Sequence, residues 1–167
     1  MSVYVKRYYE VYDNYKWIPI KSDGKLLFNI DNLSNCRSEL SEYSSRNLPE
    51  DISSEIRHEL ENNKGLYDYG YCTLNDLYEF LDKEENNFIN VLTSNSGYNT
   101  NDPNHMSDRD ILISIYKTIN CNPKDIYTDY SYSIYGFSFL IGEVTSMASL
   151  YDRLIIPNNI RLIFAFE

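Results

Sequence analysis

The sequence has few of the residues on which enzyme and metal chemistry commonly depend. Its 167 residues include two histidines, three cysteines and one tryptophan. His58 and His105 have no Cys or His neighbour at ligand spacing, which argues against a zinc site. The sequence also has no P-loop, no G-x-G-x-x-G and no G-x-S-x-G pattern. We therefore predict a protein that is not an enzyme and that uses no cofactor and no metal. An enzyme that uses a pair of carboxylates is the least supported alternative.

Long apolar segments and paired cysteines are also lacking. Cys36, Cys72 and Cys121 are widely separated and form no C-x-x-C pair, which favours a reducing compartment. The sequence does not open with a basic segment followed by an apolar one, and no apolar run reaches the length that spans a bilayer. We therefore expect a soluble, cytoplasmic protein without membrane contact.

Positive charge is in the minority. The chain has 15 Lys and Arg residues against 25 Asp and Glu residues, a net charge of −10 at pH 7. A field of this sign repels nucleic acid backbones and anionic membranes, and it attracts basic protein surfaces. We therefore expect no direct binding of nucleic acid and a protein partner with a basic surface. Charge that only keeps the protein soluble is the simpler alternative.

The clearest strand is the last stretch, residues 160–166, in which every residue except Arg161 is apolar or aromatic. A strand that is apolar on both faces has to be covered on both, so we place it in the middle of a sheet. Arg161 lies near the start of the strand, where a long side chain can still reach water. The preceding residues 157–159, Pro-Asn-Asn, predict a turn.

Two further strands are predicted near the N-terminus. Residues 3–12 alternate with a period of two, as in a half-exposed strand. Asp13 and Asn14 interrupt the pattern, and residues 15–20 continue it and contain the only tryptophan. Pro19 has no backbone donor, which restricts the second strand to the edge of a sheet. The two segments together predict a hairpin.

Helical patterns follow the hairpin. We predict a first helix that begins near Asp31. Apolar residues at four-residue spacing predict a second helix around 52–60. Thr73 and Asp76 have the spacing of a capping box, and the apolar residues that follow predict a third helix.

The second half of the chain begins with a polar, aperiodic segment. Residues 93–107 predict a mobile loop. The apolar stripe after it predicts a helix over 107–119. Residues 127–135 are rich in Tyr and Ser, which predicts an exposed strand or a loop, and a last helix is predicted over about 137–153.

The order of these elements predicts the fold class. Two strands, then several helices, then a strand are typical of an α+β protein. We expect one domain over residues 1–167, built on a mainly antiparallel sheet that combines the N-terminal hairpin with a central C-terminal strand. Four to five helices pack against this sheet.

Acidic residues are dense between positions 39 and 85. If rigid helices present them at regular spacing, they can imitate the phosphates that normally occupy a basic groove. Glu55, Glu59, Glu79 and Glu85 are therefore candidates for binding a partner. A solvated helical face is the alternative.

An aromatic segment precedes the predicted third helix. Tyr67, Tyr69 and Tyr71 alternate with an aspartate and a glycine, and such side chains can anchor a partner or stack on a base. Packing beneath a loop is the structural alternative. If the chain instead binds a signalling nucleotide, Arg46 and Lys64 are candidates for its phosphates, with Tyr67 and Tyr71 stacking on its base.

Several stretches together resemble a family of small uncharacterised bacteriophage proteins. The first two are an N-terminal strand at residues 3–6 and a Trp-containing strand at 16–20. The others are an R-x-L-P-x-D-x-S segment at 46–53, a Y-x-T-L-x-x-L helix start at 71–77 and a closing I-R-x-x-F-x-F strand at 160–167. The chain has Ser-Val where the family opens with Gly-Cys-Asp-Ile-His, and it lacks the family's His/Ser pair before the Thr-Leu helix.

The resemblance implies a phage setting, in which small acidic accessory proteins often antagonise host functions. We therefore expect a non-enzymatic phage accessory protein that works in the bacterial cytoplasm. It would bind and inhibit a host protein of defence or nucleic-acid handling through an acidic, phosphate-like surface. The alternative is a small-ligand binder that sequesters a signalling nucleotide.

Overall fold

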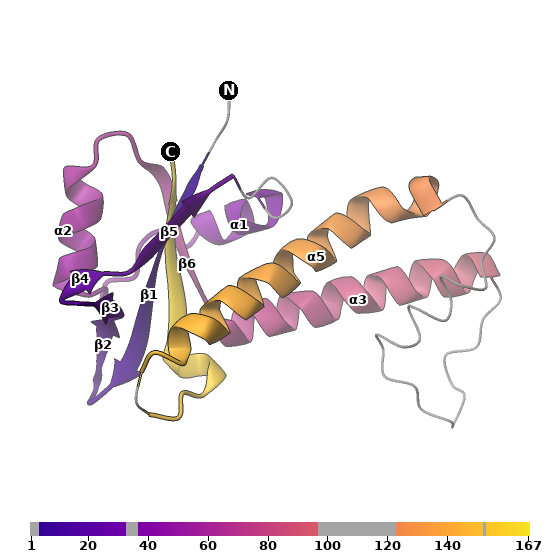
Figure 1. Ribbon diagram of the computed structural model, residues 1–167. Helices are drawn as coiled ribbons and strands as arrows, with labels where there is room; N and C mark the ends of the chain where they lie inside the picture. Colours follow the sequence, from indigo (N-terminus) through magenta and orange to yellow (C-terminus); the bar gives the residue numbers. More distant parts are fainter. Residues whose placement is uncertain (1–3, 33–36, 97–122, 152) are drawn as a thin grey trace.

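The fold is α+β, with a mostly antiparallel sheet and helices on both of its faces (Figure 1). This confirms the predicted fold class. The computed structural model describes residues 4–32, 37–96, 123–151 and 153–167.

The sheet has five strands, and all of its pairings are antiparallel. The order is β2-β1-β7-β6, and β5 pairs with β1 beside β2. The strands are β1 (Val5–Asp13), β2 (Lys16–Pro19), β5 (Phe28–Asp31), β6 (Tyr67–Thr73) and β7 (Ile160–Phe166). A separate small hairpin consists of β3 (Lys21–Ser22) and β4 (Lys25–Leu26). The predicted N-terminal hairpin is confirmed, with Pro19 on the edge strand β2.

The C-terminal strand β7 lies in the interior of the sheet, between β1 and β6. All seven of its residues are buried. Its register with β1 is continuous from Val5 opposite Phe166 to Val11 opposite Ile160. The predicted central position of this strand is confirmed, and the predicted turn before it is the short 3-10 helix η1 (Pro157–Asn159).

Helices cover the two faces of the sheet unequally. One helix, α2 (Ser54–Asn62), covers one face, and α1 (Arg37–Ser44), α3 (Leu74–Ser96) and α5 (Pro123–Ala148) lie on the other (Figure 1). We call these the α2 face and the α3–α5 face. The core of the α2 face contains Tyr8, Ile52, Ile56, Leu60, Leu66, Ile163 and Ala165. The larger core of the α3–α5 face includes Val5, Tyr9, Val11, Leu40, Leu77, Phe137, Leu140, Val144, Leu162 and Phe164.

The first strand differs from its prediction. The alternation of residues 3–12 predicted a half-exposed strand, but β1 is buried from Val5 to Val11. Helices cover both of its faces, so its polar residues lie inside and not in water. Lys6, Arg7 and Glu10 are the charged residues that this burial places in the interior.

Three other predictions need correction. The predicted start of the first helix near Asp31 is wrong, because Asp31 ends strand β5, which pairs with β1, and the helix itself is α1 at Arg37–Ser44. Residues 127–135 are part of α5 and are neither a strand nor a loop. Helix α5 lies along α3 (Figure 1), and such tertiary context can outweigh the modest helix propensity of a Tyr/Ser-rich stretch. The last helix ends at Ala148 and not near residue 153.

The predicted loop over 93–107 is partly wrong, because α3 continues to Ser96. The rest of that segment, and the helix predicted over 107–119, lie outside the described residues. The predicted capping box at the start of α3 is confirmed. Thr73 N donates to Asp76 Oδ2 at 2.8 Å, and Asp76 N donates to Thr73 Oγ1 at 3.0 Å.

Helix α1 approaches β6 very closely at Gly70. A Cβ atom at this position would lie 2.5 Å from Phe164 Cζ, 2.8 Å from the carbonyl oxygen of Tyr43 and 2.9 Å from Ser44 Cα. Two of these atoms belong to the backbone of α1 and cannot move aside alone. Glycine is therefore required here for α1 to lie against the sheet.

Candidate functional site

Arg161 is the centre of a cluster of charged side chains on the α2 face. Its Nε donates to Glu10 Oε2 at 2.7 Å, and its Nη1 donates to Asp51 Oδ1 at 2.8 Å. Its side chain is only 3% exposed. The prediction that Arg161 reaches water is therefore wrong. Glu10 on the neighbouring strand and Asp51 before α2 satisfy the guanidinium inside the protein.

Glu10 connects this cluster to the start of α2. Its side chain is fully buried, and its Oε1 accepts a hydrogen bond from the backbone N–H of Ser53 at 2.7 Å. A buried carboxylate requires such partners because removal from water is otherwise costly. The Glu10 carboxylate thus accepts hydrogen bonds both from the Arg161 guanidinium on β7 and from the backbone of Ser53, which directly precedes α2.

The only tryptophan of the chain lies on the same cluster. The Arg161 guanidinium is 3.9 Å from the centroid of the Trp17 ring, a cation–π contact. Trp17 on β2 pairs with Tyr12 on β1, and their ring centroids are 5.2 Å apart. The N-terminal hairpin therefore places an aromatic wall beside the charged cluster.

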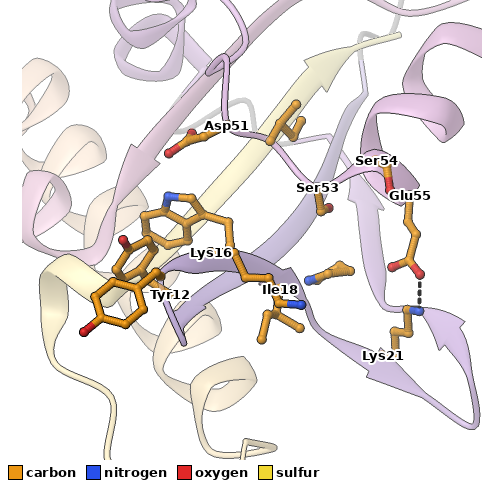
Figure 2. A pocket seen from close by; sticks show the side chains of 12 residues that line it. Tyr12, Lys16, Ile18, Lys21, Asp51, Ser53, Ser54 and Glu55 are labelled. Carbon is orange, nitrogen blue, oxygen red and sulfur yellow. Dashed lines mark hydrogen bonds and ion pairs between the residues drawn. The ribbon is translucent and has the colours of Figure 1, made fainter.

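A pocket of about 570 Å³ lies next to this aromatic wall (Figure 2). Tyr12, Tyr15 and Trp17 line it from the hairpin, and residues 51–55 line it from the start of α2. The rest of β2 and Lys21 complete the lining. The pocket therefore combines three aromatic side chains with both acidic and basic groups.

The charges around the pocket are partly paired. Lys21 and Glu55, both in the lining, form an ion pair that is drawn as a dashed line in Figure 2. Glu55 uses one carboxylate oxygen in this pair, and Asp51 uses one oxygen for Arg161. The second oxygen of each has no partner within the described residues. The Asp51 and Glu55 side chains are 64% and 47% exposed, so both remain open to a ligand.

The turn that carries Tyr15 has an unusual backbone. Asn14 has φ 51° and Tyr15 has φ 63°, and positive φ at both central residues is the pattern of a type I′ hairpin turn. Asn tolerates this conformation and Gly favours it at the second position, whereas a bulky side chain there is strained. Tyr15 is nevertheless 95% exposed, so packing within the fold does not explain its presence.

A second buried arginine lies on the α3–α5 face. Arg7 donates to Glu143 on α5 and to Asp31 on β5, with N–O distances between 2.8 and 3.0 Å. Burial acts to lower the pKa of the Arg7 guanidinium, but the hydrogen bonds to Glu143 and Asp31 outweigh it and the pKa is raised. This cluster ties α5 to the sheet.

The four predicted acidic contact residues do not form one surface. Glu55 and Glu59 lie on α2, whereas Glu79 and Glu85 lie on α3, and these helices cover opposite faces of the sheet. Glu55 pairs with Lys21 and the Glu59 carboxylate is 3.9 Å from Lys6 Nζ. Glu79 accepts a hydrogen bond from the neighbouring side chain of Asn75 at 2.9 Å. The structure therefore offers two separate acidic pairs.

The predicted tyrosines lie on strand β6 and not in a loop. A register shift between Tyr67 and Gly70, with Asp68 at φ 46°, turns Tyr67 to the α3–α5 face. The Tyr67 ring lies 6.2 Å from that of Phe166 on that face. Tyr69 and Tyr71 pack against the core of the α2 face. The three tyrosines are therefore divided between the two faces.

The residues predicted to bind a nucleotide are only partly brought together. Arg46 donates to both carboxylate oxygens of Asp76, at 2.7 and 3.2 Å. Burial acts to raise the pKa of Asp76, but the hydrogen bonds from Arg46 and the Thr73 backbone outweigh it and the pKa is lowered. Arg46 lies 5.6 Å from the Tyr71 ring, whereas Lys64 is exposed in the turn before β6.

Two features are lacking in the part of the chain that the structure describes. There, no three His, Cys, Asp or Glu side chains are grouped so that they could hold a metal ion. Within the same ranges, no helix combines the length and the apolar content that a bilayer crossing requires.

Sequence reasoning missed most of the residues around the pocket. Glu10, Trp17 and Asp51 meet at Arg161, although none of them was a candidate for binding. Each of three residues lies in a short stretch that stands out in the sequence: Trp17 in the N-terminal hairpin, Asp51 just before the second helix and Arg161 in the closing strand. These three stretches converge at this cluster.

Comparisons with known proteins identify no relative. No family model matches the sequence, and neither the curated proteins nor the solved structures give a match.

Proposed function

We propose that this chain is a non-enzymatic binding protein of a bacteriophage that occupies a basic surface of a bacterial host protein. The host protein would belong to defence or to nucleic-acid handling, as the resemblance and the net charge imply. The observation that carries the proposal is how the fold distributes charge. Among the described residues, burial removes three basic side chains but one carboxylate from the surface, and exposed carboxylates outnumber exposed basic side chains.

Six basic residues take part in ion pairs with carboxylates of the same chain. They are Lys6, Arg7, Lys21, Arg46, Arg153 and Arg161. Three of the six are buried. The excess of carboxylates, which gives the net charge of −10, is therefore concentrated at the surface, where it can steer a basic partner.

The outer side of α2 is the surface that fits this role best. Ile56 and Leu60 face the core, and Glu55, Glu59 and Glu61 are exposed. Glu55 and Glu59 are four residues apart, so they lie on the same side of the helix, about 6 Å apart along its axis. A rigid helix holds these carboxylates at a fixed spacing, as a basic groove that binds phosphates requires.

The two acidic pairs on opposite faces allow a matched experiment. One variant carries Glu55→Lys and Glu59→Lys on α2, and the control carries Glu79→Lys and Glu85→Lys on α3. Both change the net charge equally. Each is used at low salt to capture proteins from host lysate, and association rates are then measured with the captured partner. We expect the α2 variant to lose the partner, or to bind it more slowly and with a weaker salt dependence.

The control defines what would contradict the proposal. If the α3 variant loses the partner to the same extent, only net charge matters and α2 is not the contact surface. If the wild-type protein retains no host protein at low salt, the proposed function is wrong.

A further inference from the structure

The pocket beside α2 has the chemistry of a receptor for a guanidinium group. Its aromatic side chains are Tyr12, Tyr15 and Trp17. Trp17 already contacts one guanidinium within the protein, that of Arg161 at 3.9 Å. Arg161 itself is buried and does not line the pocket, so it leaves the pocket open. Aromatic faces attract arginine because the planar cation stacks on them and is weakly hydrated.

Two carboxylates complete such a receptor. Asp51 and Glu55 line the pocket, and one oxygen of each has no partner within the described residues. Lys21 is neutralised by Glu55, which leaves Lys16 as the cation of the lining without a carboxylate partner in the described part of the chain. The start of α2 favours an anion, but Asp51 already supplies a negative charge there, because Glu10 alone offsets the charge of Arg161. The net charge of −10 further favours a cation.

Tyr15 is an independent indication that the pocket binds something. It is 95% exposed, it lines the pocket, and it has φ 63° at a turn position where glycine would be unstrained. The fold gains no packing from this side chain. An exposed aromatic side chain in a strained turn is what an interface anchor on a hairpin requires.

We propose that this pocket takes an arginine side chain from the basic surface of the partner protein. The arginine would stack between the aromatic side chains and donate hydrogen bonds to the open oxygens of Asp51 and Glu55. This inference rests on the proposed function and deepens it, because it names the anchor that gives the complex its lifetime. Charge on α2 then guides the encounter, and the pocket holds the partner.

Trp17 provides a direct readout, since it is the only tryptophan of the chain. Its emission is recorded while a short oligo-arginine peptide is added, and separately with oligo-lysine, AMP and inorganic phosphate. We expect a saturable change with oligo-arginine, a weaker affinity for oligo-lysine, and no change with AMP or phosphate. A response to AMP or phosphate without one to oligo-arginine would overturn the inference in favour of an anion site.

Two variants test the pocket itself. Tyr15→Gly removes the aromatic side chain and the strain together, so we expect the melting temperature to rise by about 2–4 °C while the affinity for oligo-arginine falls about fivefold. A purely structural Tyr15 would give the rise without the loss of affinity. Glu55→Gln is compared with Glu79→Gln on α3, which removes the same charge from the other face. We expect Glu55→Gln alone to weaken oligo-arginine binding.

The outcomes separate this inference from the proposed function. If Glu55→Gln and Glu79→Gln weaken oligo-arginine equally, the peptide senses only net charge and the pocket is not its site. If the complex of Tyr15→Gly with the host partner dissociates as slowly as that of the wild type, the inference is overturned. The proposed function is then still tested separately by the charge reversals on α2. Faster dissociation from Tyr15→Gly, with an unchanged association rate, supports the pocket as the anchor.

Discussion

Replacing Arg161 by methionine tests how much the fold depends on the buried ion cluster. The substitution removes hydrogen bonds to Glu10 and Asp51 and leaves the Glu10 carboxylate fully buried with only the Ser53 N–H as a partner. An uncompensated buried charge of this kind costs about 3–5 kcal/mol. Since small domains are stable by roughly 5–15 kcal/mol, Arg161→Met is expected to remove a large part of the free energy of unfolding.

Two comparison variants set the scale. Asp51 is 64% exposed, so Asp51→Asn is expected to cost about 1 kcal/mol or less. Arg153 is also 64% exposed and pairs with Asp13, so Arg153→Met serves as the matched control and is expected to have a similarly small effect. Adding Glu10→Gln to Arg161→Met removes the buried charge and keeps an acceptor for Ser53. The double variant is therefore expected to be more stable than Arg161→Met alone.

Urea unfolding, followed by far-UV circular dichroism and by Trp17 emission, measures all four variants. Circular dichroism is the primary probe, because Arg161 contacts Trp17 and its loss changes the emission baseline. The reasoning would be refuted if Arg161→Met cost less than about 1 kcal/mol, or if Arg153→Met were as destabilising. It would also be refuted if the double variant were less stable than the single one.

Two further predictions concern other parts of the fold. Gly70→Ala would place a methyl group against the backbone of α1 and is expected to destabilise the protein by about 1–3 kcal/mol. Gly142→Ala on α5, where nothing lies within 4 Å, should instead stabilise it by about 0.5–1 kcal/mol, and urea midpoints distinguish the two. The lowered pKa of Asp76 stabilises the fold above its unfolded pKa of about 4, and this contribution is lost as pH falls through the folded pKa. The melting temperature of Asp76→Asn should therefore lie below that of the wild type at neutral pH and approach it below about pH 4, whereas a constant difference would contradict the assignment.

Local patterns predicted the parts of the fold that local interactions determine. The capping box of α3 involves residues three positions apart, and the central place of β7 follows from its apolar residues on both faces. The burial of Arg161 could not be predicted in this way. Its partners Glu10 and Asp51 are 151 and 110 positions away in the sequence, so only the folded chain brings them together.

The same limit applies to the first strand and to the tyrosines of β6. Alternation along β1 predicted one solvent-exposed face, because nothing in its charged residues indicated that Glu143 and Arg161 would pair with them inside the protein. A single register shift after Tyr67 divides the aromatic residues of β6 between the faces. A period-two pattern carries no signal for such a shift. The pocket depends on a turn and a helix start from separate segments, and their proximity could not be predicted either.

The place of β7 between β1 and β6 has a consequence for how the chain acquires its structure during synthesis. The ribosome delivers β1 well before β7, yet these two strands are neighbours along seven paired positions. Until residues 160–166 emerge, one edge of β1 and the inner edge of β6 have no partner within the sheet. Open strand edges are templates for pairing with other chains. Sheet closure is therefore a late, long-range step, slow by the standards of local folding, during which the growing chain depends on protection from aggregation.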